Sequence, residues 1–160
     1  MGRAVARLVL GAILLLGSTA CRRAAPSPDV KPQVETYQLR VQGSTGWSTF
    51  RVELALTRSQ QARGLMYRSE MGQDQGMLFV FRSDSVKQFY MKDTYIPLDM
   101  IFIDRGGVVV GVVHRATPHT TKTRSVGLPS RYVLELNGGV ARRLGIAKGS
   151  KVDLSRIPYR

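Results

Sequence analysis

The sequence predicts an α+β fold that is rich in β-strands: a small curled sheet or partly open β-barrel with two short helices. The main observation is a series of short segments in which apolar and polar residues alternate, separated by glycine-containing turns. Only two segments carry helical signals. The single cysteine, Cys21, rules out an intrachain disulfide, so packing must stabilise the domain.

The first two strands are predicted to form a hairpin. Tyr37, Leu39 and Val41 alternate with polar residues, which is the period of a half-buried strand. A turn at residues 43–46 follows, and residues 50–56 repeat the alternation. Further strands are predicted at residues 77–81, 89–92, 98–104, 108–114, 132–136 and 151–154.

Two short helices are predicted between these strands. Thr57 can cap the first, at residues 58–66, because its side-chain oxygen can accept a hydrogen bond from the first turn. An Asn-Gly-Gly sequence at residues 137–139 leads into the second, at residues 140–144. Residues 115–131 are a long polar stretch with little periodicity, which is typical of a functional or mobile loop.

The N-terminus has the three parts of a secretory signal peptide. Arg3 and Arg7 form a positively charged leader before nine mostly aliphatic residues, 8–16, and the small residues 18–20 offer a cleavage site. Nine apolar residues are too few to span a bilayer, which takes about 20. We therefore expect residues 1–20 to be removed and the protein to be exported.

Cys21 directly follows this signal, which is the pattern of a bacterial lipoprotein whose acylated thiol anchors it to a membrane. The alternative is an ordinary signal peptide cut near Ala20 that leaves a free thiol. Residues 21–34 contain three prolines and are predicted to be a semi-extended tether. Residues 35–160 are predicted to form a single β-rich domain. By analogy with enterobacterial sorting, Arg22 favours the outer membrane, with the domain on the periplasmic side.

The charge of the chain is strongly basic. It is +13, and it falls to +11 once residues 1–20, which hold two arginines and no acids, are removed. A basic surface favours anionic partners such as lipid headgroups, acidic envelope polymers or nucleic acid. Residues 145–152 resemble a DNA-binding hairpin but equally fit a glycine-containing turn into a last strand. Because export argues against it, no nucleic acid partner is predicted.

Four separate segments together carry a family resemblance. They are Arg63–Met66, Gly76–Phe79, Met91–Phe102 and Leu134–Gly139. In order and spacing they resemble the domain-of-unknown-function 192 family, small bacterial and archaeal proteins that are often exported. The resemblance runs from about residue 53 to residue 154 and implies a compact β-rich domain, with no established reaction.

Three charged residues stand among apolar neighbours and form a candidate polar site: Arg63, Asp99 and Glu135. Two carboxylates and a guanidinium could bind a polar ligand, with Thr94 and Asn137 as hydrogen-bonding neighbours. If the carboxylates crowd each other, one pKa rises and the pair could act as acid and base. The alternative is structural: Arg63 ties the first helix to the sheet through an internal ion pair with Asp99 or Glu135.

The sequence predicts neither a metal site nor a cofactor. Thioether sulfur can bind Cu(I), but the spacing of the methionines forms no compact cluster, so they are expected to fill the core. The two histidines are weak evidence for any site, and there is no nucleophile elbow or phosphate-binding loop. The methionines in question are Met66, Met77, Met91 and Met100.

These observations leave three functions open. The favoured one is an exported, lipid-anchored binding or accessory module of the cell envelope, held to the membrane through Cys21. The second is an envelope hydrolase that uses Asp99 and Glu135 as a carboxylate pair. The third is a structural protein that binds anionic envelope components or an envelope protein through its basic surface.

Overall fold

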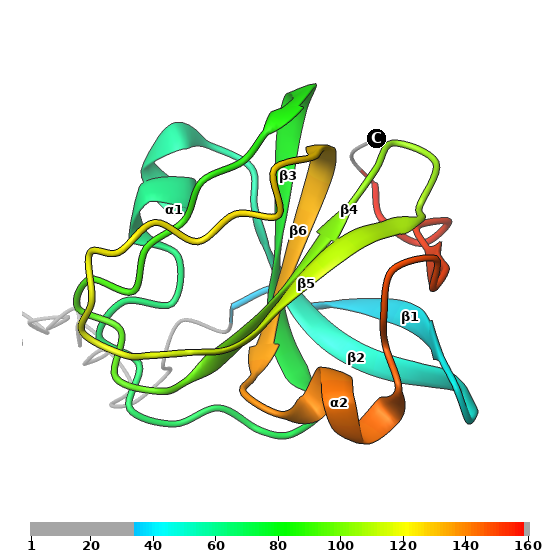
Figure 1. The fold of residues 1–160 in the computed structure, drawn as a ribbon, viewed down its shortest axis with the longest axis horizontal. Coiled ribbons are helices and arrows are strands. Elements are labelled where there is room, and N and C mark those ends of the chain that lie inside the picture. Colours follow the sequence, from blue (N-terminus) through cyan, green and yellow to red (C-terminus); the bar gives the residue numbers. More distant parts are fainter. Residues whose placement is uncertain (1–33, 159–160) are drawn as a thin grey trace, which may run out of the picture. The chain divides into compact units, whose positions relative to one another are not determined.

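The structure, a computed structural model, describes residues 34–158, which contain a seven-stranded sheet and two short helices (Figure 1). The sheet order is β5-β4-β6-β3-β2-β1-β7, and the sheet curls into a half-barrel, which confirms the predicted fold class. Cys21, the predicted signal peptide and most of the predicted tether lie outside the described residues. The elements are β1 Tyr37–Gly43, β2 Gly46–Ala55, α1 Arg58–Arg63, β3 Gln75–Val86, β4 Leu98–Ile103, β5 Val109–Ala116, β6 Pro129–Asn137, α2 Val140–Leu144 and β7 Val152–Asp153.

Strands β1 and β2 form the predicted hairpin, closed by the pair Gly43 and Gly46. Strand β2 then pairs with β3 in parallel, whereas the other strand pairs among the described residues are antiparallel. A parallel pair needs a crossover connection, and the segment that contains α1 supplies it. The crossover places α1 beside the β2–β3 pair, at one side of the sheet (Figure 1).

The C-terminal segment links the first strand to the start of β5. Val152 in β7 is paired with Val41 in β1. On its other side, the amide of Val152 donates to the carbonyl of Gly107 at 2.7 Å, and Lys151 forms a bridge with Val108. These contacts bring the two ends of the curled sheet together. Among residues 34–158, no helix is long and apolar enough to cross a membrane.

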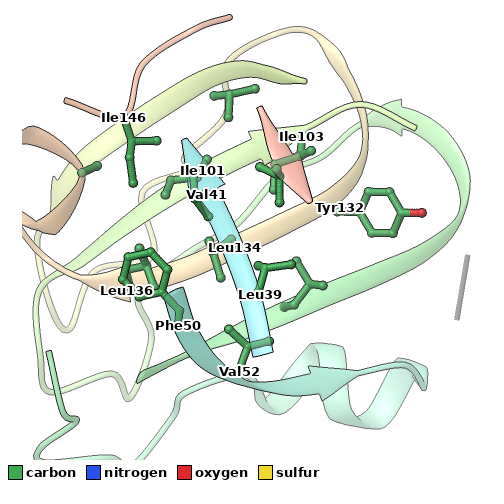
Figure 2. Close-up of a cluster of buried hydrophobic side chains, with 14 of the residues drawn as sticks. Leu39, Val41, Phe50, Val52, Ile101, Ile103, Tyr132, Leu134, Leu136 and Ile146 are labelled. Atoms are coloured by element: carbon green, nitrogen blue, oxygen red, sulfur yellow. The ribbon is translucent and has the colours of Figure 1, made fainter. Parts of the chain in front are cut away.

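Strands β4 and β6 are buried on both faces. All six residues of β4 are buried, as are the five central residues 132–136 of β6. One face packs into an α2-side core with α2 and strands β1 and β2 (Figure 2). The other packs into an α1-side core with the residues that follow α1 and with the segment after β3. Members of the α2-side core include Leu39, Phe50, Ile101, Leu134 and Leu136, and members of the α1-side core include Leu65, Phe79, Met91, Met100 and Phe102.

Two sequence predictions of local structure are wrong. Residues 89–92 are not a strand, because only one bridge, between Phe89 and Arg124, pairs this segment. The first helix ends at Arg63 instead of residue 66, since Gly64 takes a positive φ of 46° and breaks the helix. The predicted Thr57 cap is present, with Gln60 completing a capping box.

Helix α1 is held to the sheet by polar contacts, since none of its residues is buried. The side-chain amide of Gln61 donates to the carbonyl of Ala55 at 3.2 Å and to that of Val80 at 2.9 Å. These two carbonyls belong to β2 and β3, so Gln61 fixes the helix over the parallel pair. An element with so little buried apolar surface opens more easily than the core strands do.

Candidate functional site

Asp99 and Glu135 lie on adjacent strands but point to opposite faces of the sheet. The register of β4 and β6 pairs Asp99 with Leu136, and Glu135 with Met100. Paired residues share a face, and neighbours along a strand alternate. Asp99 therefore faces the α2-side core and Glu135 the α1-side core. The carboxylate pair expected for a hydrolase is not formed.

Asp99 is fully buried and accepts three backbone hydrogen bonds. Its Oδ1 accepts from the amide of Arg115 at 2.7 Å, and its Oδ2 accepts from the amides of Gly139 and Ala141 at 2.9 and 2.8 Å. Gly139 is the N-cap of α2 and has no side chain to cap it, so Asp99 supplies the cap from a neighbouring strand. Asp99 is thus a structural anchor for α2 and for the end of β5.

Glu135 is buried without a partner. Its side chain is 4% exposed, and among residues 34–158 no hydrogen bond or ion pair reaches its carboxyl group. Burial disfavours the charged form and raises the pKa of Glu135 from 4.5 to about 8. At neutral pH this carboxyl is therefore mostly protonated, and it is able to donate as well as accept a hydrogen bond.

Glu135 lines a cavity of about 260 Å³ beside the end of α1, which we call the α1 cavity. Residues 61–66 form one side of it, and the rings of Phe79, Phe81 and Phe89 form an aromatic wall. The Phe79 and Phe89 rings meet edge to face with centroids 5.0 Å apart, and those of Phe81 and Phe89 at 6.3 Å. The α1 cavity thus combines an apolar wall with one buried acid.

Arg63 and Thr94, two further residues of the predicted site, also line the α1 cavity. Arg63 is exposed, and among the described residues its guanidinium makes no hydrogen bond or ion pair, so the predicted internal tie to Asp99 or Glu135 is not formed. Thr94 is buried, and its hydroxyl donates to the carbonyl of Lys92 at 3.2 Å.

Asn137 does not line the α1 cavity. Its side-chain amide donates to the carbonyls of Met71 and Gly72 at 2.7 and 3.1 Å, which holds the loop before β3 against the end of β6. The structure therefore brings three of the five predicted residues to one cavity. The other two, Asn137 and Asp99, form hydrogen bonds that hold loops and strands of the domain together.

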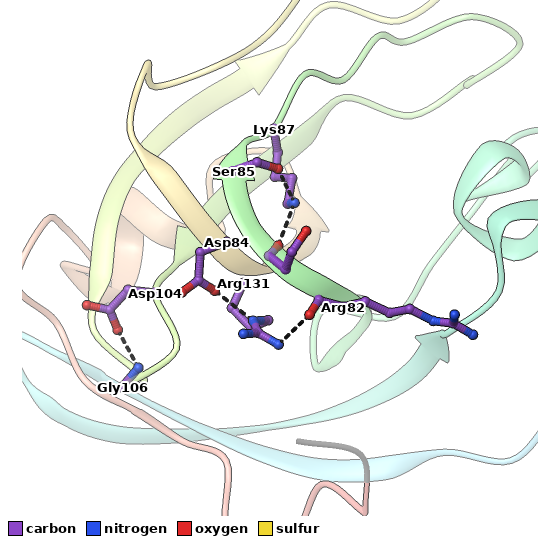
Figure 3. A network of polar contacts seen from close by, with 8 residues as sticks. Arg82, Asp84, Ser85, Lys87, Asp104, Gly106 and Arg131 are labelled. Carbon is purple, nitrogen blue, oxygen red and sulfur yellow. Dashed lines mark hydrogen bonds and ion pairs between the residues drawn. The ribbon is translucent and has the colours of Figure 1, made fainter.

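Lys87 lines the α1 cavity and was missed by the sequence analysis. Its ammonium group donates to the carbonyl of Ser83 and to the hydroxyl of Ser85 (Figure 3). It also lies 4.3 Å from the centre of the Phe81 ring. Burial lowers the pKa of Lys87 from its ordinary value. Lys87 stands in a polar stretch of sequence with no periodicity, so no local signal marks it as buried.

A larger hollow of about 680 Å³ lies beside α1 but has a weaker claim to be a site. Of the charged residues that line it, Glu53 and Arg68 are paired with each other at 2.7 Å, and Arg63 lines the α1 cavity as well. The other charged residues that line the larger hollow are Glu35 and Glu70. Among the described residues, two fully buried polar atoms, His114 Nδ1 and Ser130 Oγ, have no hydrogen-bond partner, but neither residue lines the α1 cavity.

The methionines are placed largely as predicted. Met77, Met91 and Met100 are buried in the α1-side core, which confirms their packing role, whereas Met66 is half-buried and lines the α1 cavity. Within residues 34–158, no group of three or more His, Cys, Asp or Glu side chains is placed to hold a metal ion.

Comparisons with known proteins agree with this architecture. Residues 38–154 match the DUF192 family, described as "Uncharacterized ACR". A Sinorhizobium meliloti structure described as a "putative transcription regulator" is 38% identical, with a TM-score of 0.72 over 75% of this chain and 94% of that chain. A protein of unknown function from Novosphingobium aromaticivorans is also 38% identical, with a TM-score of 0.74 over 86% of this chain and 98% of that chain. No curated protein matches.

Replacing Asp99 by Asn should lower the free energy of unfolding by about 2–4 kcal/mol, measured by urea denaturation. Both oxygens of Asp99 accept amide protons, so an Asn amide group must face at least one backbone donor. Asp104→Asn is the matched control, because Asp104 accepts from Gly106 and Val108 through one oxygen only. Equal losses in the two variants would contradict the anchoring role.

The stability of the protein should depend on the protonation of Glu135. Because its folded pKa of about 8 lies above 4.5, its contribution is complete below pH 4.5 and is lost as the pH rises toward 8. Glu135→Gln should remove this fall, so the stability difference between variant and wild type should grow with pH. Urea denaturation at several pH values measures it, with the exposed Glu70→Gln as control. Parallel pH profiles for wild type and Glu135→Gln would show that the acid is not held neutral.

Proposed function

This chain belongs to the DUF192 family, and from that premise we propose that it is a binding module of the bacterial cell envelope. The proposed ligand is a small amphipathic molecule that enters the α1 cavity. The single observation that carries this proposal is the Glu135 carboxyl group, which is buried, has no partner within residues 34–158 and is part of the lining of a cavity with an aromatic wall.

A buried polar group without a partner reduces stability by about 1–3 kcal/mol. Asp99, on the neighbouring strand, avoids this loss by accepting three hydrogen bonds, but Glu135 does not. A ligand whose polar group meets the Glu135 carboxyl would supply the missing partner. A concave, mostly apolar site with few polar groups and a shifted pKa is the usual form of a small-molecule site.

The carboxylate pair expected for a hydrolase is not available in the α1 cavity. Such a pair needs both acids within reach of one substrate, and Asp99 lies on the other face of the sheet from Glu135. No Ser, Cys or His among the described residues lines the α1 cavity, and the hydroxyl of Thr94 is donated to a backbone carbonyl. A hydrolase built on the predicted carboxylate pair is therefore not proposed.

The cellular setting is proposed from the sequence. The charged, apolar and small-residue parts of the N-terminus support export, and Cys21 after them supports a lipid anchor at the periplasmic side of a membrane. The basic charge supports contact with anionic envelope components. Nucleic acid is not proposed as a partner, because residues 145–152 pass from the end of α2 through a turn to β7 instead of forming a projecting hairpin.

A neutral probe, 3-phenylpropan-1-ol, should bind in the α1 cavity. Its titration should move the NMR signals of Leu65, Phe89 and Thr94 saturably and leave α2 unchanged. Gly64→Ala should weaken binding at least about fivefold, because the added Cβ would lie 3.1 Å from Cζ of Phe79 in the aromatic wall.

Gly127→Ala is the matched control for this test. Gly127 also has a positive φ, but no atom lies within 4 Å of an added Cβ, so strain is introduced away from the α1 cavity. Shifts that do not saturate, or that Gly64→Ala leaves intact, would contradict binding in the α1 cavity.

Cys21→Ser should release the protein from the membrane. Without the thiol no lipid can be attached, so in a Gram-negative host the variant should move from the membrane pellet to the periplasmic fraction. Fractionation followed by immunoblotting measures this, with the conservative Ser27→Ala in the predicted tether as control. Equal membrane association of wild type and Cys21→Ser would contradict the lipid anchor.

A further inference from the structure

We propose that the ligand of the α1 cavity is a small monocarboxylate with an apolar body, whose carboxylate shares a proton with the Glu135 carboxyl group. This inference rests on the proposed function and adds the chemical class of the ligand. Size, charge and the chemistry of Glu135 each argue for it.

The size of the α1 cavity limits the ligand to a ring or short chain with one polar group. Its volume is about 260 Å³. An apolar protein cavity of about 150 Å³ is large enough to bind benzene. The additional space accommodates a short side arm, so a ligand of on the order of ten non-hydrogen atoms fits. The aromatic wall of Phe79, Phe81 and Phe89 offers faces and edges against which an apolar body can pack.

The charges around the α1 cavity favour an anion. Apart from Glu135, the charged side chains that line it are Arg63 and Lys87, both basic. Two of the Lys87 donors are used by Ser83 and Ser85, whereas the Arg63 guanidinium makes no hydrogen bond or ion pair among the described residues. A guanidinium fork matches a carboxylate, and a ligand cation would be repelled by both side chains.

The surroundings of Glu135 leave a protonated acid as the group that meets the ligand. From β3 and β4 it is flanked by the uncharged Met77 and Met100. The titratable groups that line the α1 cavity with it are Arg63 from the end of α1 and Lys87 and Tyr90 from the segment after β3. None of them forms an ion pair or hydrogen bond with its carboxyl.

A second carboxylate brought against Glu135 would form a pair that shares one proton. Two carboxyl groups in one site cannot both ionise easily, so one of them keeps its proton. An O–H···O⁻ hydrogen bond between them is shorter and stronger than a neutral one. The proton stays on the oxygens of the pair, no covalent bond changes, and the net negative charge of the pair faces the two basic side chains. An amine ligand would instead need Glu135 to lose its proton.

Helix α1 is the element whose movement would let a ligand reach the α1 cavity. It buries none of its residues and is held over β2 and β3 by the two hydrogen bonds of Gln61. Displacement of α1 alone therefore exposes little apolar surface, and it moves residues 61–63 away from the lining of the α1 cavity while the buried Leu65 stays in the core.

The test compares three probes with the same ring and chain length: 3-phenylpropanoate, 3-phenylpropan-1-ol and 3-phenylpropan-1-amine. Calorimetry on the purified protein near pH 6 should show that the carboxylate binds at least about tenfold more tightly than the amine. Near pH 9, one unit above the Glu135 pKa of about 8, its affinity should fall about tenfold, and that of the alcohol should change little.

Two variants separate the roles of the two charged groups. Glu135→Gln keeps a donor but cannot titrate at this position, so between pH 6 and pH 9 the affinity of the carboxylate should fall much less for this variant than for wild type. Arg63→Gln should weaken the binding of the carboxylate several-fold and leave the affinity for the alcohol unchanged. The exposed Glu70→Gln should behave as wild type in every titration.

The outcomes distinguish this inference from the proposed function. If the amine binds more tightly than the carboxylate, or if the affinity of wild type for the carboxylate does not change with pH, the ligand is not a monocarboxylate. The proposed binding function of the α1 cavity would then still stand. Saturable binding by none of the three probes would overturn both.

Discussion

The burial of β4 and β6 on both faces is the constraint on which the rest of this structure depends. A strand with a core on each side has no solvent for a polar side chain, so an acid there must be hydrogen bonded, paired or kept neutral. These two strands hold one acid each, Asp99 and Glu135, and the register sends them to opposite faces. Asp99 is therefore hydrogen bonded within the scaffold, whereas Glu135 lines the α1 cavity.

Asp99 shows how a buried carboxylate can organise a fold. By accepting amides from Arg115, Gly139 and Ala141, it connects the end of β5 and the start of α2 to β4. Helix α2 is only five residues long and its N-cap is Gly139, which has no side chain, so its N-terminal amides depend on an outside acceptor. Asp99, from β4, therefore holds α2 in position against the α2-side core.

Glu135 shows the opposite arrangement. It faces a cavity beside a short helix that buries none of its own residues, and in the part of the chain that the structure describes its carboxyl group gains no hydrogen bond in return for its burial. Ligand-binding segments commonly belong to the less stable parts of a protein. A polar group there can lack a hydrogen-bond partner until the ligand binds, at a cost in stability. In the function proposed above, the aromatic wall and the basic side chains of Arg63 and Lys87, which line the same cavity, select the ligand that meets Glu135.

The sequence by itself determined the β-rich class, the hairpin of β1 and β2, the Thr57 cap and the family, because alternation, capping and short motifs are local properties. It also marked Arg63, Thr94 and Glu135, which do line one cavity. Only the tertiary structure decided that Asp99 turns away from Glu135, that Lys87 is buried and lines the same cavity as Glu135, and that residues 89–92 remain outside the sheet. The first of these depends on the register between β4 and β6, which are distant in sequence, and a shift of one residue would have turned every side chain of the shifted strand to the other face. The other two depend on how the segment after β3 packs against the α1-side core, which no local pattern predicts.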